Sequence, residues 1–166
     1  MTLAQYNDLE SYTNNQEIAQ ALSAINVNLS TGFGTNYLNH YVEILLLLEM
    51  LPSMPEGIED ILLWKPVSYI DHVRESNLPQ FELVLEAFEH ADAKRREVLR
   101  EVTDEADEQV LHFIEQAQKA VALGDNEKTI SVSQEAKATL TPMLEKISGV
   151  ICSPYFLAEE QMDDFV

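Results

Sequence analysis

The sequence predicts an all-α protein, a single-domain up-and-down helical bundle with one nearly all-apolar central helix and short connecting helices. Three observations lead to this prediction. The chain has only 5 Gly and 6 Pro in 166 residues, too few for the many turns of an all-β fold. Apolar residues recur at intervals of three and four, the spacing of one helix face. The length and the 46% hydrophobic content are sufficient for a sizeable buried core.

The first main helix is expected at residues 14–29. Asn14 and Glu17 have the spacing of a capping box, and the apolar residues that follow lie on one helical face. A short helix of its own is compatible with residues 2–13. The segment STGFGTN at 30–36 ends this unit, because its two glycines are poor helix formers.

Residues 36–52, NYLNHYVEILLLLEMLP, are the densest apolar stretch of the chain. A membrane span needs about 20 predominantly apolar residues. His40, Glu43 and Glu49 interrupt this stretch, so we exclude a span. Because a helix that is apolar all round is buried on all sides, we predict a central core helix here.

Two short helices are expected next. Ser53 and Glu56 have capping-box spacing before the first of them. Ser68 is the expected N-cap of the second, with Asp71 at the position where the helix dipole favours an acid.

The longest periodic tract covers residues 78–123. It is either one helix or two, since Thr103 followed by acids has the pattern of an N-cap. Asp125 or Asn126 is the expected cap of the last long helix. The apolar seam of that helix stays in phase across Pro142, so we expect a kink there rather than an end.

We expect residues 1–152 to form the bundle domain and residues 153–166 to form an acidic amphipathic C-terminal tail. The tail mixes aromatic and acidic residues, a composition that docks into basic-rimmed grooves of partners. The alternative is a short helix packed on the bundle itself. The candidate partner-binding residues of the tail are Tyr155, Phe156, Leu157, Met162 and Phe165.

The net charge is the outlying property of the composition. The chain has 29 Asp and Glu against 10 Lys and Arg, a net charge of −19, and residues 1–64 contain no Lys or Arg. Such a field repels phosphates and anionic lipid, so direct binding of nucleic acid or of a membrane surface is disfavoured. A basic protein partner is favoured instead, and a homodimer is a further option.

A cytoplasmic location is expected from two features. The first ten residues, MTLAQYNDLE, lack the basic and apolar regions of a signal peptide. Cys152 is the only cysteine, so no intrachain disulfide forms, as in proteins of reducing compartments.

Each of the four histidines has an acid at helical spacing, and helical bundles build carboxylate–His metal sites from ligands on several helices. The candidate ligands of a divalent metal ion are His40, Glu43, His72, His112 and Glu115. However, the order His-x-x-Glu is the reverse of the di-iron motif, and 29 acids place one near every histidine by chance. The alternative is a set of surface or core-edge histidines that hydrogen-bond to carboxylates or carbonyls.

The segment KRREVLR at 94–100 concentrates basic residues, of which Arg95, Arg96 and Arg100 are candidates for binding an anion or an acidic partner. The alternative is pairing with acids along the same helix. Arg95 falls on the apolar seam, which indicates either a helix end or a buried pair.

No catalytic or nucleotide-binding motif stands in the sequence, so an enzyme is not the favoured prediction. The favoured function is a non-enzymatic protein–protein interaction or regulatory module. One alternative is a metal-binding helical bundle. A second alternative is an acidic mimic of nucleic acid, which requires two rows of acids at the spacing of phosphates.

Overall fold

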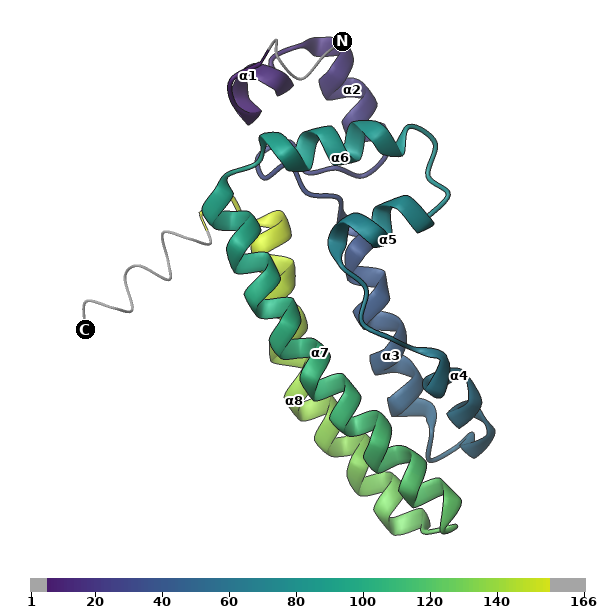
Figure 1. Ribbon diagram of the computed structural model, residues 1–166. Helices are drawn as coiled ribbons and strands as arrows, with labels where there is room; N and C mark the ends of the chain where they lie inside the picture. The colour runs from purple at the N-terminus through teal and green to yellow at the C-terminus, as the bar shows by residue number, and fades with distance from the viewer. Residues whose placement is uncertain (1–5, 156–166) are drawn as a thin grey trace, which may run out of the picture. The chain divides into compact units, whose positions relative to one another are not determined.

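A computed structural model describes residues 6–155, and helices joined by short segments make up this part of the chain (Figure 1). The all-α prediction is confirmed. The helices are, in chain order, α1 (Leu9–Thr13), α2 (Gln16–Ala24), the 3-10 helix η2 (Thr35–Tyr37), α3 (Leu38–Met50), the 3-10 helix η3 (Pro55–Gly57), α4 (Ile58–Leu63), α5 (Tyr69–Glu75), α6 (Phe81–His90), α7 (Ala93–Ala122) and α8 (Asn126–Cys152). None of the helices in 6–155 is both long and apolar enough to cross a bilayer.

The described residues divide into two compact units. Unit 1 comprises residues 6–37, Val67–Glu101 and 147–155, and unit 2 comprises Leu38–Pro66 and Val102–Lys146. The long helices α7 and α8 each contribute residues to both units. The two units are described in turn.

The core of unit 1 contains a group of packed aromatic rings. The rings of Tyr69 and Phe88 stack with centroids 4.5 Å apart, and Phe33 lies 5.8 Å from Tyr69. The hydroxyl of Tyr69 accepts a hydrogen bond from the backbone N–H of Gly34 at 2.7 Å, and burial raises the pKa of Tyr69 to about 12. Gly32 has φ +77°, and a Cβ there would lie 2.8 Å from the carbonyl oxygen of Ala87, so glycine is required where this loop crosses α6.

The last carbonyls of α8 are satisfied within unit 1 by side chains that are distant in sequence. A helix leaves its last four carbonyls without intrahelical partners, and burying them unpaired costs free energy. Thr31 donates its hydroxyl to the carbonyl of Ile151, and the amide of Asn28 donates to the carbonyl of Cys152 at 3.2 Å. Arg95 supplies the third set of donors to this helix end, as described below.

The core of unit 2 is built where α3, α4, α7 and α8 meet. Its buried residues are Ile44, Leu48, Leu51, Ile61, Val110, Phe113, Ile114, Ala117, Val132, Ala136 and Leu140. The core residues of α7 and α8 include both small side chains, such as Ala117 and Ala136, and large ones, such as Phe113 and Leu140.

Helix α3 is buried on one face only, so the prediction of a helix buried on all sides is wrong. Tyr41, Ile44 and Leu48 are buried. By contrast, Val42, Leu46 and Met50 are 39%, 50% and 49% exposed. The apolar composition of α3 therefore exceeds what the core of unit 2 covers.

The tract 78–123 is two helices, and the break lies at Ala91 and Asp92 rather than at the predicted alternative, Thr103. The Asp92 carboxylate accepts a hydrogen bond from the backbone N–H of Arg95 at 2.9 Å, the geometry of an N-cap. Thr103 is buried inside α7. As predicted, α8 continues through Pro142.

The predicted caps of three other helices have different outcomes. Asp125 accepts from the N–H of Lys128 at 2.9 Å, as expected at the start of α8. Asn15, and not Asn14, caps α2 through the N–H groups of Glu17 and Ile18. The predicted box at Ser53 is wrong, because Met54 precedes η3 and makes no side-chain cap bond.

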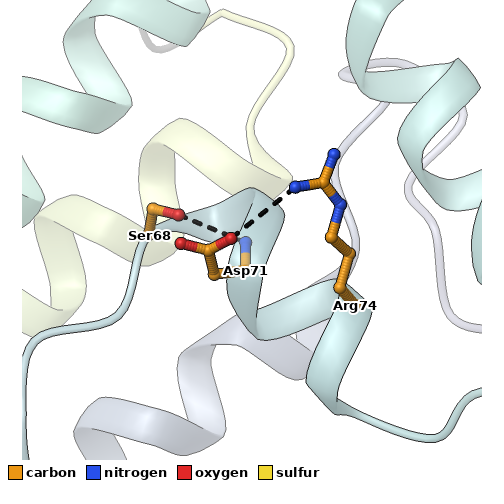
Figure 2. Close-up of polar contacts among 3 residues, drawn as sticks. All are labelled: Ser68, Asp71 and Arg74. Carbon is orange, nitrogen blue, oxygen red and sulfur yellow. Dashed lines mark hydrogen bonds and ion pairs between the residues drawn. The ribbon is translucent and has the colours of Figure 1, made fainter.

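Ser68 caps α5 as predicted. Its hydroxyl accepts a hydrogen bond from the backbone N–H of Asp71 at 3.2 Å, and the Asp71 carboxylate pairs with Arg74 at 3.7 Å (Figure 2). The cap and the acid both satisfy the positive end of the helix dipole.

We predict that Ser68→Ala lowers the free energy of unfolding by about 1 kcal/mol, because an N–H of the first turn of α5 loses its acceptor. Urea unfolding followed by circular dichroism measures this change. Ser53→Ala is the matched control, since Ser53 is exposed and outside any cap, and it is expected to change stability by less than about 0.5 kcal/mol. Equal losses in the two variants would contradict the assignment of the caps.

Candidate functional site

The histidines proposed as metal ligands are distributed over both units. His40 and His112 belong to unit 2, and His72 belongs to unit 1. Within residues 6–155, no three His, Cys, Asp or Glu side chains gather in a way that suits a metal ion. The converging ligand set that a metal-binding bundle requires is thus not formed by these residues, and the metal hypothesis stays a prediction.

His40 lies among aromatic side chains at the edge of the unit 2 core. Its ring stacks on Trp64 with centroids 4.7 Å apart and 20° between the planes. Trp64 also donates its indole N–H to the backbone carbonyl of His40 at 3.1 Å, while Glu43 is exposed. This arrangement fits the core-edge alternative that the sequence left open. Trp64 was not singled out from the sequence, although a lone tryptophan after a short helix is a signal for packing.

The remaining metal candidates lie in separate surroundings. His72 packs edge-on against Tyr37 at 5.3 Å, and burial lowers the pKa of His72. His112 is exposed on α7. Glu115 pairs with Lys119 at 2.6 Å, and this hydrogen bond lowers the pKa of the Glu115 carboxyl. The Glu115 carboxylate is therefore engaged in an ion pair of the kind that α-helices form at a spacing of four residues.

Arg95 is a structural residue of unit 1. It is 5% exposed, and its guanidinium donates to the carbonyls of Val150 at 2.6 Å, Ser153 at 2.8 Å and Pro154 at 3.1 Å. The sequence indicated either a helix end or a buried pair at Arg95. Arg95 lies at the start of a helix, and it is also buried. Its hydrogen-bond acceptors are backbone carbonyls of the last turn of α8 and the residues after it.

The other two anion candidates are closer to the surface. Arg96 is half-buried, with its guanidinium carbon 5.9 Å from the centre of the Phe88 ring, within the range of a cation–π contact. Arg100 is exposed. The three arginines thus occupy different environments, and whether Arg96 or Arg100 binds an anion stays a prediction.

A pocket of about 470 Å³ lies in unit 1 beside Arg95. Its lining residues are Asp8, Leu9, Glu10, Thr13, Leu29, Ser30, Thr31, His90, Asp92 and Arg95. Three carboxylates face one guanidinium there, and Arg95 is engaged by carbonyls. This composition disfavours an anionic ligand.

A part-buried polar pair in unit 2 was not predicted from the sequence. The hydroxyl of Tyr41, on the buried face of α3, donates to the carboxylate of Asp107 on α7 at 2.9 Å. Burial, with a smaller contribution from nearby Asp104, raises the pKa of Asp107 to about 6 although the Tyr41 hydrogen bond opposes this shift. The sequence signal, an acid among apolar positions of a periodic tract, is weak because α7 has many acids.

The C-terminal candidates are only partly described. Tyr155 is exposed. Phe156, Leu157, Met162 and Phe165 lie outside the described residues. The role of the tail in partner binding stays a prediction.

Exposed large apolar side chains concentrate in unit 2. Those of the segment Leu38–Pro66 are Val42, Leu46, Met50, Met54, Leu62 and Leu63. The exposed acids of the same segment are Glu43, Glu56, Glu59 and Asp60. Apolar and acidic side chains are thus interspersed on this segment, which contains a single basic residue, Lys65.

Comparison of the chain with protein-family models, curated proteins and solved structures finds no match.

We predict that Arg95→Ala lowers the free energy of unfolding by about 3 kcal/mol, because the buried carbonyl of Val150 and the part-buried carbonyls of Ser153 and Pro154 lose a charged donor. Arg95→Lys is expected to recover part of the loss, since an ammonium keeps the charge but not the planar fork. Chemical denaturation measures both variants. Arg74→Ala removes only an exposed pair and serves as the control, with an expected change below about 1 kcal/mol. A loss in Arg95→Ala no larger than in this control would contradict the structural role.

We predict that Asp107→Asn raises the free energy of unfolding above that of the wild type at pH 7, and that this gain is smaller at pH 4. The pKa of Asp107 is raised in the folded state to about 6. The folded state therefore favours the protonated carboxyl. The stability that this form contributes is fully present below the unfolded pKa near 4 and is lost as the pH rises through about 6. Asparagine stays neutral and still accepts from Tyr41. The expected gain at pH 7 is on the order of 1 kcal/mol, allowing for partial solvent exposure.

Urea unfolding of the wild type and the variant between pH 4 and pH 7 measures this difference. Glu108→Gln changes an exposed acid one residue further along α7. A gain from Asp107→Asn that does not vary between pH 4 and pH 7, or that Glu108→Gln reproduces, would contradict the assignment.

Proposed function

We propose that this chain is a protein–protein interaction module that binds a basic partner protein through the segment Leu38–Pro66 of unit 2. The observation that carries the proposal is the surface of this segment. Its acids Glu43, Glu56, Glu59 and Asp60 are exposed among exposed apolar side chains. Protein interfaces combine these two features, an apolar centre and a charged rim that selects the partner.

The composition of the chain supports an external partner for these acids. With 29 Asp and Glu and 10 Lys and Arg, most carboxylates have no basic residue of the chain to pair with. Of the ion pairs in the described residues, that of Glu115 with Lys119 lies outside the segment, whereas Glu49 inside it pairs with Lys137. A field of this sign steers basic proteins toward the surface and raises their association rate.

We predict that the full chain retains basic proteins from a lysate of cells that express it, and that raising salt from 50 to 500 mM releases them. The variant with Glu43→Gln, Glu56→Gln, Glu59→Gln and Asp60→Asn is expected to retain them at least about 10-fold less, because charge pairs across an interface contribute more than 1.4 kcal/mol in total. Quantitative mass spectrometry of the retained proteins measures the change.

The control variant removes the same charge from exposed acids of unit 1, with Glu10→Gln, Glu17→Gln, Glu82→Gln and Glu89→Gln. It is expected to retain the partners nearly as well as the wild type. Equal losses in the two variants would show only a general charge effect and would overturn the proposed segment. Retention of no basic protein at low salt would overturn the proposed function.

A further inference from the structure

The exposed apolar side chains of α3 form a stripe. Val42, Leu46, Met50 and Met54 are spaced by four residues, and successive members are offset by only about 40° around a helix. Met54 lies in the turn after α3, where its N–H donates to the carbonyl of Met50 at 3.0 Å. All four side chains are at least 39% exposed. We call these four residues the α3 stripe.

A glutamate flanks the α3 stripe on each side. At about 100° per residue, Glu43 lies on one side of Leu46 and Glu49 lies on the other. Glu43 is exposed, whereas Glu49 is half-buried and pairs with Lys137 at 3.3 Å. The surface therefore has an apolar centre with a carboxylate along each edge.

Helix α4 adds the same kinds of side chain next to α3. The two helices are in contact, and Figure 1 shows α4 beside the end of α3. Leu62 and Leu63 are exposed on α4, as are Glu59 and Asp60. Helix α4 thus carries the same mixture of exposed apolar and acidic side chains as the α3 stripe and its flanks.

From this arrangement we propose that the α3 stripe binds an amphipathic helix of the partner whose apolar face is bordered by Lys and Arg. This inference rests on the proposed function and specifies its partner. An apolar seam at four-residue spacing matches the apolar face of an incoming helix, which presents residues at the same spacing. Lysines and arginines on the rim of that helix would lie opposite the exposed Glu43.

Charge favours this occupant over a second copy of the chain. A second copy would bring the same flanking glutamates and a net charge of −19 against the same charge. Like charges placed across an interface are unfavourable, whereas opposite charges steer encounter and fix the register. An anionic lipid surface is disfavoured for the same reason.

A fluorescein-labelled 18-residue peptide of Leu and Lys, with Leu on one helical face, is the probe. We expect it to bind the full chain, as measured by fluorescence anisotropy, and to bind the double variant Leu46→Gln, Met50→Gln at least about 10-fold more weakly, because two central apolar anchors are lost. A peptide of the same composition, scrambled so that it has no apolar face, is expected to bind at least about 10-fold more weakly than the probe.

Leu123→Gln is the matched control, since Leu123 is an 81% exposed leucine of the same unit outside the stripe. Its expected affinity is within about 2-fold of the wild type, as for a residue outside an interface. Because the substituted side chains are exposed, folding is expected to be retained, and circular dichroism checks this.

Three results would overturn the inference. Equal affinity of the probe for the wild type and the stripe variant, or equal affinity of the probe and the scrambled peptide, would show binding by charge alone, and the proposed function would stand. A wild-type dimer in sedimentation equilibrium that the stripe variant abolishes would make a second copy the occupant.

Discussion

Unit 1 depends most on the hydrogen bonds that side chains donate to the last carbonyls of α8. These carbonyls are buried or half-buried, and their donors come from Asn28, Thr31 and Arg95, which lie in two segments far from α8 in sequence. Each donor joins its segment to the helix end, so three parts of the chain are held by one set of polar contacts. Because an unpaired buried carbonyl costs free energy, removing one donor affects all three segments. For this reason we assign Arg95 a structural role in unit 1.

Unit 2 has a different constraint, an excess of apolar side chains on one helix. Only part of the circumference of α3 packs on α4, α7 and α8. The remainder of its apolar residues is partly exposed, although full burial of such a side chain contributes roughly 1.5–3 kcal/mol. Exposed apolar surface that follows a regular stripe, with acids along both edges, is typical of a surface that another helix covers.

Local signals were sufficient for the fold class and for several caps. Ser68 and Asp125 cap their helices as predicted, because an N-cap depends on residues only two or three positions away. The boundary at Asp92 was not predicted, since the apolar period continues in phase across it. The apolar pattern of residues 36–52 also does not indicate how many helices pack around α3. Its exposed face could therefore not be predicted. The number of neighbours is a property of the packed unit rather than of the helix.

The site residues were harder to predict because their partners are distant in sequence. Arg95 donates to Val150, which is 55 positions away, and Tyr41 donates to Asp107, which is 66 positions away. The pairs of histidine and acid were read from spacing along single helices, but a metal site requires several helices to converge. Among residues 6–155 such a convergence of three ligands is not formed. Trp64 stacks on His40 from a separate helix end, which spacing could not indicate.

The most direct test of the central claim is a methyl NMR titration of the full chain, labelled with ¹³C at the methionine methyl groups, with the Leu and Lys helix. Met50 and Met54 belong to the α3 stripe, whereas Met143 is half-buried against the core of unit 2. The signals of Met50 and Met54 are expected to shift in proportion to the bound fraction, while that of Met143 stays in place. Binding that leaves Met50 and Met54 unmoved would contradict the claim.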